Sequence, residues 1–476
     1  MAMIVAKDEP LLTGTYSVHD VVEKIGFGRF QVVLSILCGL LMMADAMEIM
    51  LLSILSPALV CEWQITSFEQ AFGTTAVFIG WAIASPFWGW FCDRHGRKRG
   101  LVLASLLGGV AGLATAFSPN FATFVFMRGC VGLAVAGAPQ ATTLYTEFLP
   151  TASRAKCVVF LEVWWAIGCA FEALLALVVM PIWGWRGLVV FSSIPLFLFA
   201  FCCFLLPESP RFYVSRGKMT RAFNVLSRIS AMNKKQLPEG DLTSEPPSSK
   251  PSFKILINKE WRRTSILLWI LWICFAFTYY GVTLYTTKIV QSTDPCHGGS
   301  PAQNVTASFD PHAPGSSGVC KQLTSEQYID ILKTSFSEVP GLVLVALLID
   351  RIGRRKTIAL QYFIFALSNF ALLVCMSESM IIAVIFVARA VASGALQCIY
   401  VYTPEVYPTT LRARAIGTAS TFARLGAMAT PLVAQMLGDF SMKVSLLVYG
   451  LSGIIGTVAA LLLPIETAGR EMRDIH

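Results

Sequence analysis

The chain has 476 residues, of which 55% are hydrophobic and only 14% are charged, and its formal net charge is +8. A soluble protein has too little interior to bury that much apolar surface, so the composition indicates an integral membrane protein. The chain also lacks a nucleophile elbow, a P-loop, a zinc-spaced set of His and Cys and a dinucleotide-binding glycine motif. We therefore expect neither an enzyme nor a bound metal or cofactor.

Apolar runs of about 20 residues, the length that crosses a bilayer as a helix, recur along the chain. Segment 1–30 precedes the first run and shows no cleavable signal-peptide pattern, so we expect the first run to act as the insertion signal. We predict twelve membrane-spanning helices, at 31–58, 69–91, 100–118, 121–144, 156–180, 187–206, 264–289, 326–349, 357–376, 379–402, 413–437 and 442–463.

The predicted fold class is an all-α membrane protein with twelve transmembrane helices in two six-helix halves. The halves span 31–206 and 264–464. A polar loop, 207–263, joins them, and a C-terminal segment, 465–476, follows the second half.

The distribution of basic residues predicts the orientation. Most of the 37 lysines and arginines lie in the terminal segments and in the loops that follow even-numbered spans. Cytoplasmic loops carry such an excess, so both termini are predicted to face the cytosol. The positive net charge thus reflects topology and does not indicate nucleic-acid binding.

The longest loop on the opposite side, 290–325, carries signs of an outer, oxidising compartment. It contains the one glycosylation sequon of the chain, at Asn304, which we predict to be modified. It also contains Cys296 and Cys320, which we predict to form a disulfide, although Cys61 faces the same side and is an alternative partner.

Two acids, Asp45 and Glu48, interrupt the apolar stretch GLLMMADAMEIMLLSIL in the first span. An ionisable residue inside the bilayer is costly unless it is paired or hydrated, so each is a candidate for function. Residues three apart lie on neighbouring stripes of one helix face. We predict that the pair binds a cation, carries a proton, or does both. The alternative is a structural salt bridge to an arginine of the fourth or eleventh span.

Three arginines lie in later spans, and each must face a partner or a cavity because it stays charged in the membrane. Arg128, near a carboxylate, would suit proton coupling. Arg389 is its counterpart in the second half, and a structural ion pair and a functional role are both open for it. Arg424 is the best candidate to meet an anionic group of a substrate.

Polar and aromatic side chains of other spans complete the predicted substrate site. Aromatic rings suit a planar or cationic ligand, although most aromatics of membrane proteins serve packing or the interface belt. Glu172 and Glu338 are further acids within spans. The predicted substrate-binding residues are Asp45, Glu48, Gln140, Glu162, Trp165, Tyr279, Tyr280, Gln397 and Arg424.

The two halves resemble each other in sequence. DRHGRK at 93–98 recurs as DRIGRR at 350–355, YTEFLPTASRA at 145–155 as YTPEVYPTTLRARA at 402–415, and PESPR at 207–211, more loosely, as PIETAGR at 464–470. The nearly constant offset implies two halves related by an axis along the membrane normal, with a site between them near the midplane.

Charged residues of these repeats lie at predicted cytoplasmic helix ends, where they would form a gate of ion pairs. The alternative is anchoring by positive charge alone, in which the acids would have no role. The predicted gate residues are Gly89, Asp93, Arg94, Gly96, Arg97, Glu147, Arg154, Asp350, Arg351, Gly353, Arg354, Glu405 and Arg412.

The first of these motifs, Gly89-xxx-Asp93-Arg94-x-Gly96-Arg97-Lys98, resembles the signature loop of the major facilitator superfamily. PESPR is similar to a motif of its sugar-porter and organic-ion branch. More narrowly, ADAMEIMLLSILSP and YVYTPEVYPTTLRARAIGT resemble the synaptic-vesicle-two-related transporters (SVOP and SVOP-like) and their nicotinate-transporter relatives. The second signature loop departs from the first, with Ala346 in the place of Gly89, and segment 1–30 is shorter than the tail expected for SVOP.

The resemblance implies a monomeric secondary active transporter that moves a small organic ion, nicotinate-like or cationic, by alternating access. Proton coupling would use Asp45, Glu48 and Arg128. A ligand with an anionic group and a ring nitrogen, such as a pyridine carboxylate, would match Arg424 and the two acids. The alternative is a transporter-like vesicle protein that binds a ligand or partner with little transport. The expected location is an intracellular vesicle, such as a synaptic vesicle, or the plasma membrane.

Overall fold

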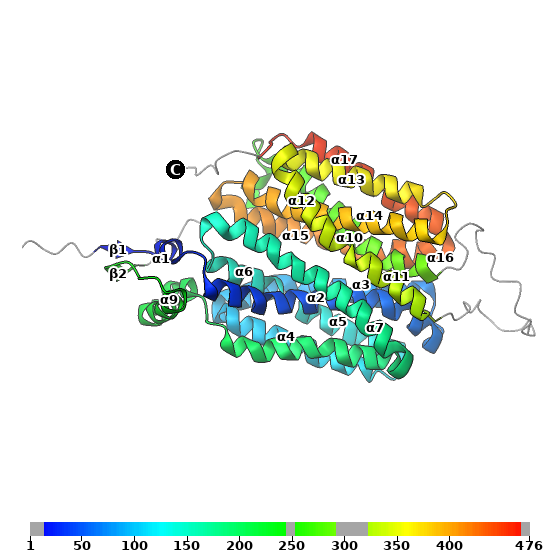
Figure 1. Cartoon of the computed structure of the whole chain (residues 1–476), viewed down its shortest axis with the longest axis horizontal. Helices are drawn as coiled ribbons and strands as arrows, with labels where there is room; N and C mark the ends of the chain where they lie inside the picture. The colour runs from blue at the N-terminus through cyan, green and yellow to red at the C-terminus, as the bar shows by residue number, and fades with distance from the viewer. Residues whose placement is uncertain (1–13, 244–252, 292–321, 468–476) are drawn as a thin grey trace, which may run out of the picture.

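The computed structural model describes residues 14–243, 253–291 and 322–467, and two helical bundles lie side by side in it (Figure 1). The first bundle contains α2 (Arg29–Trp63), α3 (Ser67–His95), α4 (Arg97–Ala116), α5 (Phe121–Val135), α6 (Pro139–Glu147), α7 (Thr151–Cys202) and the 3-10 turn η1 (Cys203–Leu205). The second contains α10 (Arg262–Gln291), α11 (Ser325–Phe336), α12 (Glu338–Ile352), α13 (Arg354–Ala371), α14 (Glu378–Val406), α15 (Thr409–Pro431), the π-helical turn η3 (Leu432–Leu437), α16 (Gly438–Phe440) and α17 (Met442–Leu462).

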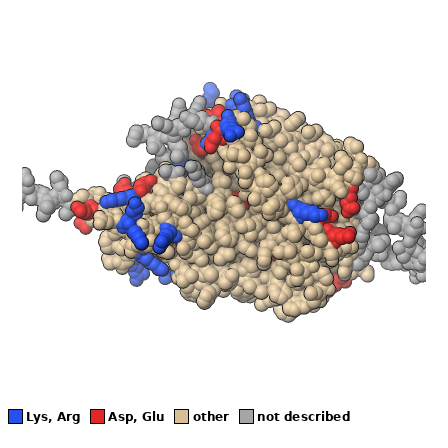
Figure 2. Space-filling view, viewed as in Figure 1, with Lys and Arg blue, Asp and Glu red and all other residues tan. Residues whose placement is uncertain are grey.

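The outer surface of the bundles suits a lipid environment. Within the described part of the chain, nine helical segments are long and apolar enough to cross a membrane. Large apolar side chains such as Phe126 and Ile83 are exposed on them, as expected where lipid replaces water. Charged side chains gather toward the ends of the molecule and leave a wide uncharged band between them (Figure 2).

Several predicted spans have a different internal structure from a single straight helix. The spans 156–180 and 187–206 both fall in α7, which turns at Gly184, where φ is 63° and ψ is −167°. The span 121–144 is divided into α5 and α6, and the span 326–349 into α11 and α12. The α13 and α15 spans are too polar to count among the nine apolar segments.

The predicted cytoplasmic segments are structured where they are described. The N-terminal part forms β1 (Thr15–Tyr16) and α1 (Val18–Ile25), and the central loop forms α8 (Pro210–Ser215), α9 (Met219–Asn233), β2 (Asp241–Leu242) and the 3-10 turn η2 (Phe253–Ile257). The strands β1 and β2 pair in parallel, and the apolar face of α1 packs against α9. The elements β1, β2, α1 and α9 lie together at one end of the molecule (Figure 1), whereas η2 packs against α10 and α15.

The two bundles meet along a few helices. α3 packs against α15 and η3, α7 against α11, and α2 against α10. These contacts leave a space between the bundles at the end that carries α1 and α9, and the candidate site lies there.

The predicted features of the outer loop fall largely outside the described residues. Asn304, Cys296 and Cys320 all lie there. Cys61, at the end of α2, is described and is disulfide-bonded. Glycosylation of Asn304 and pairing of Cys296 with Cys320 stay predictions.

Candidate functional site

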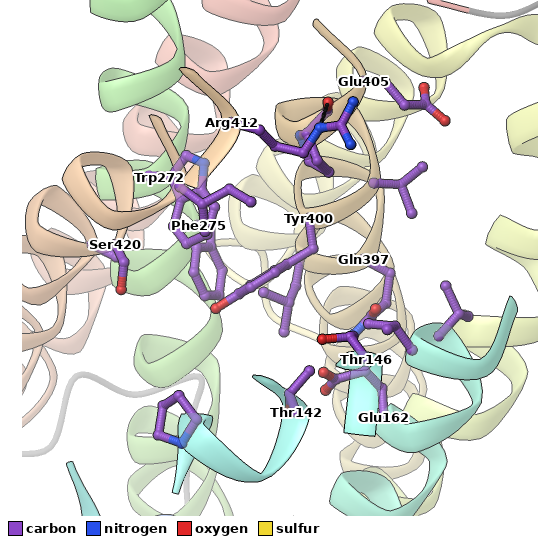
Figure 3. A pocket seen from close by; sticks show the side chains of 18 of the residues that line it. Thr142, Thr146, Glu162, Trp272, Phe275, Gln397, Tyr400, Glu405, Arg412 and Ser420 are labelled. Carbon is purple, nitrogen blue, oxygen red and sulfur yellow. Dashed lines mark hydrogen bonds between the residues drawn. The ribbon is translucent and has the colours of Figure 1, made fainter. Parts of the chain in front are cut away.

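A cavity of about 1320 Å³ lies between the two bundles. Its wall is formed by α2, α3, α6 and α7 on one side and by α10, α14 and α15 on the other (Figure 3). Charged residues at the predicted cytoplasmic helix ends, such as Glu147, Arg154, Glu405 and Arg412, line its mouth. The cavity therefore opens toward the predicted cytosolic side.

Most residues predicted to bind substrate line this cavity. They are Asp45, Glu162, Trp165, Tyr279, Tyr280, Gln397 and Arg424. The side chain of Asp45 is buried, and its Oδ1 atom has no hydrogen-bond partner in the described structure. The guanidinium of Arg424 lies over the face of Trp81, 3.6 Å from the ring centroid. The structure thus brings a carboxylate of the first bundle and a guanidinium of the second into the same cavity.

Glu48 and Gln140 do not line the cavity, so their predicted contact with a substrate has no support in this geometry. Glu48 forms an ion pair of 2.8 Å with Arg128, and both side chains are almost fully buried. Gln140 accepts a hydrogen bond of 2.7 Å from Arg97, near the predicted cytosolic surface. The rotation of α2 separates the two acids: Asp45 faces the cavity, while Glu48 faces α5.

Arg389 also has a buried partner, Glu338, at 3.0 Å. The same carboxylate accepts hydrogen bonds of 3.1 Å from the hydroxyl of Tyr279. That hydroxyl in turn accepts a bond of 2.5 Å from the indole N–H of Trp165. A chain of hydrogen bonds therefore leads from the cavity wall to the buried ion pair, and it crosses from α7 of the first half to α10 of the second.

Other hydrogen bonds between the halves lie beyond this chain, toward the predicted outer side. Ser53 of α2 donates to the carbonyl of Thr283 at 2.8 Å. Gln435, in the π-helical turn η3, donates to Ser56 at 3.1 Å and to Thr74 at 3.2 Å. All these partners are neutral. They close the end opposite the cavity mouth, so the cavity opens toward the predicted cytosolic side.

Tyr279→Phe is expected to loosen this closure, because it removes the one hydroxyl that joins Trp165 of the first half to Glu338 of the second. The bond that it removes between the halves joins two neutral groups, the indole N–H of Trp165 and the hydroxyl, and contributes ~0.5–1.5 kcal/mol. The outward-facing fraction should therefore rise about twofold or more. A cysteine placed at Ala58, in the small outer pocket between α2 and α11, reports the opening through its rate of labelling by an impermeant thiol reagent.

The matched control is Tyr285→Phe, on the same helix α10. The Tyr285 hydroxyl is buried and has no hydrogen-bond partner in the described structure, so its removal should leave the labelling rate unchanged. Equal labelling in wild type and Tyr279→Phe would show that this chain does not hold the outer side closed.

The predicted gate residues form two similar networks, one in each half. Arg97 pairs with Asp93 at 3.1 Å and with Glu147 at 3.3 Å. Arg354, its repeat counterpart, pairs with Asp350 at 2.9 Å and with Glu405 at 3.2 Å.

The remaining predicted gate residues contribute less to these ion pairs. Arg154 donates to the carbonyl of Leu149, and Arg412 to that of Pro404. Arg351 is exposed, and Arg94 lies over Trp90. The position of Gly89 is surrounded by open space.

Two acids that were not assigned a role from the sequence complete the networks. Glu208 accepts hydrogen bonds from the backbone N–H groups of Arg97 and Lys98, at the start of α4. Glu466 does the same for Arg354 and Arg355, at the start of α13. Burial raises the pKa of Glu208, and these N–H donors oppose the shift. The sequence signal for Glu208 and Glu466 was the recurrence of PESPR as PIETAGR, which contain these two acids.

Further cavity residues were also missed by sequence reasoning. They are aromatic or hydroxyl side chains at positions without a sequence motif, namely Trp81, Thr142, Thr146, Trp272, Phe275, Tyr400 and Ser420. Only the packing of the helices shows which aromatic rings face the cavity and which face lipid.

Comparison with known proteins defines the class of this protein. The sequence profile of the Major Facilitator Superfamily matches residues 37–294 and 327–473, and the chain belongs to this family. Its members are transporters and not enzymes. The protein is therefore an integral, multi-pass membrane transporter of this superfamily, and its substrate is not established.

Two relatives and one solved structure place it more narrowly. The synaptic vesicle 2-related protein of Rattus norvegicus is 44% identical over 460 residues, covering 97% of this chain and 83% of the relative. The organic cation/carnitine transporter 7 of Arabidopsis thaliana is 31% identical over 500 residues, covering 96% of each chain. The resemblance to the synaptic-vesicle-two-related transporters predicted from the sequence is thus confirmed.

The solved structure is the xylose transporter XylE of E. coli in a partially occluded inward open conformation. It superposes with a TM-score of 0.69 at 17% identity, covering 91% of this chain and 98% of XylE. At that identity the likeness shows the fold alone, and it confirms the predicted twelve-helix architecture.

Proposed function

We propose that the protein is a secondary active transporter that carries a small organic ion by alternating access, with protons as the coupling ion. The observation that carries this proposal is the cavity between the two halves, with Asp45, Glu162 and Arg424 on its wall. It is open at one end and closed at the other by hydrogen bonds between the halves. Ionisable groups at membrane depth are typical of sites that bind or move ions.

Asp45 is the proposed proton carrier, since it faces the cavity and its Oδ1 has no partner in the described structure. Glu48 and Arg128 hold each other as an ion pair one helical turn away. Arg424 lies within electrostatic range of Asp45. Protonation of Asp45 removes its charge and leaves Arg424 less compensated, which links the binding of a proton to the binding of a charged substrate.

The two cytosolic networks are the proposed inner gate. Here Arg97 and Arg354 each pair within their own half, and the cavity is open between them. The same mouth is lined by Glu147 and Arg154 of one half and by Glu405 and Arg412 of the other. Figure 3 shows Glu405 and Arg412. Closure would bring these opposite charges together and exclude water. A vesicle membrane is the proposed location, since one relative is named a synaptic vesicle 2-related protein.

Asp45→Asn is expected to lower proton-driven uptake by at least about tenfold, because an amide cannot carry the proton. The purified protein is reconstituted in liposomes with an inward proton gradient. Uptake of radiolabelled organic ions, among them nicotinate and quaternary amines, is compared with that of protein-free liposomes. Asp330→Asn is the matched control, because Asp330 lies on α11 outside the cavity and pairs with Lys333.

Gradient-driven uptake at the wild-type rate in Asp45→Asn would contradict the role of Asp45. Absence of uptake of every ion by the wild-type protein would contradict the transport proposal itself and favour a protein that binds a ligand without moving it.

A further inference from the structure

The charged groups deep in the cavity differ in how well they are compensated. Asp45 and Arg424 lie within electrostatic range of each other, and Arg424 also lies over Trp81. Glu162 of α7 has no such partner. Among the side chains that the structure describes, no Lys, Arg or His lies within 4.0 Å of its carboxylate. Its electrostatic neighbours include the amide of Gln397 and two further acids, Glu338 and Asp45.

An aromatic wall from the second half lines the same cavity as Glu162. We define this wall by Trp272, Phe275 and Tyr400. The rings of Trp272 and Tyr400 have centroids 4.6 Å apart, and those of Phe275 and Tyr400 are 6.2 Å apart. Figure 3 shows Glu162 beside Gln397, with Tyr400 reaching from the same helix toward Phe275. Glu162 lies within electrostatic range of the Tyr400 hydroxyl.

We propose that the substrate carries a positively charged nitrogen, which binds between the carboxylate of Glu162 and this aromatic wall. A carboxylate neutralises the charge of an organic cation, and the faces of Trp, Tyr and Phe attract it further. An anion would instead be repelled by Glu162 at close range. The inference rests on the proposed function, in that it takes the occupant of the cavity to be the transported substrate.

The position of the two binding elements adds a second argument. Glu162 belongs to the first half, whereas the aromatic wall belongs to α10 and α14 of the second. A cation bound between them contacts both halves at once. A ligand can favour a conformation only through contacts that differ between the states, and contacts to both halves meet that need. Arg424 remains available for an acidic group on the same molecule.

Four pyridines that share one ring but differ in charge test the proposal. They are nicotinamide, which is neutral, 1-methylnicotinamide, a permanent cation, nicotinate, an anion, and 1-methylnicotinate, a zwitterion. Binding to the purified full-length protein is measured by titration of its thermal stability. We expect 1-methylnicotinamide to bind at least about tenfold more tightly than nicotinamide, and the zwitterion more tightly than nicotinate.

Two variants assign the preference to the carboxylate. Glu162→Gln is nearly isosteric and should abolish the preference for the methylated cation, whereas Glu162→Asp keeps the charge and should retain it. Glu172→Gln is the matched control on the same helix. Glu172 is buried, is hydrogen-bonded to Ser192 and does not line the cavity, so this variant should keep the preference. The melting temperature without ligand checks that each variant is folded.

Several results would overturn the cation site. They are no binding of 1-methylnicotinamide at millimolar concentration, equal binding of cation and neutral amide, tightest binding of nicotinate, or a preference that survives Glu162→Gln. Cation binding with this preference but without uptake in liposomes would overturn the transport proposal and leave the site intact. Uptake of organic ions without any preference for cations would overturn the cation site and leave the transport proposal intact.

Discussion

Arg389→Leu is expected to destabilise the protein by about 3–5 kcal/mol, because it leaves the Glu338 carboxylate buried without its ionic partner. Both side chains of this pair are essentially inaccessible, and their separation is 3.0 Å. The Tyr279 hydroxyl remains as a neutral donor, which cannot neutralise the charge. The loss is measured as the fall in melting temperature of the purified protein in detergent, with the yield of monodisperse protein as a second readout.

The double variant Glu338→Gln with Arg389→Leu should recover at least half of the lost stability, since it removes the unpaired charge and leaves an amide that Tyr279 can still reach. Lys333→Leu is the control. Lys333 and Asp330 form an exposed pair on α11, and breaking such a pair costs less than about 1 kcal/mol. A melting temperature of Arg389→Leu equal to that of wild type would show that the buried charge is compensated in another way.

The two buried ion pairs are related but not equivalent. Arg128 and Arg389 stand in corresponding spans of the two halves, on α5 and α14. Their acids do not correspond, because Glu48 comes from the first span of its half and Glu338 from the second span of the other half. In the second half the first span supplies the neutral Tyr279 instead. Of the two ion pairs, only Glu338–Arg389 is linked to the cavity wall by hydrogen bonds in the described structure.

The fold was predictable because a span needs a long apolar run and because cytoplasmic loops are rich in lysine and arginine. The positions at which helices turn or divide within a span were harder to predict. The turn at Gly184, which joins two spans in α7, requires a positive φ. The sequence contains many glycines, and nothing in it distinguishes this one as the site of the turn. The strand β1 was also hidden, since its partner β2 lies more than two hundred residues away, in a segment read as a loop.

The sequence predicted which types of residue form the site, but it did not predict which of their side chains face the cavity. Charge in an apolar run identified Asp45, Glu48 and Arg128 as groups that need a partner. The spacing of Asp45 and Glu48 allowed both to face one cavity, yet the packing of α2 turns only Asp45 toward it. Helix rotation follows from long-range packing, which a single sequence does not state.

The two ion-pair networks at the predicted cytosolic end each depend on a glycine. Gly96→Ala is expected to lower the free energy of unfolding by at least about 2 kcal/mol. Gly96 has φ at 105°, where a side chain costs about 1–3 kcal/mol. A Cβ atom there would lie 2.2 Å from Oε2 of Glu208. Glu208 cannot move away without losing the backbone donors of Arg97 and Lys98, and a lost helix cap costs ~1 kcal/mol.

Gly353→Ala, at the repeat position before α13, should behave in the same way. Its φ is 89°, and a Cβ atom would lie 2.8 Å from Oε2 of Glu466. Gly89→Ala is the matched control within the same signature loop. A Cβ atom at Gly89 meets nothing within 4 Å, and the other half already carries Ala346 at the corresponding position. Alanine is favoured over glycine inside a helix by up to ~1 kcal/mol, so this variant should melt at or slightly above the wild-type temperature.

Melting curves of the three purified variants test the predicted changes in stability. Uptake in liposomes measures the effect of each variant on transport. Because Glu208 also orders the start of α4, where Arg97 pairs with Glu147, Gly96→Ala should disturb the proposed inner gate as well as the fold. Equal melting of Gly96→Ala and Gly89→Ala would contradict the capping role of Glu208. The signature loop would then act through its positive charge alone, as in the anchoring alternative.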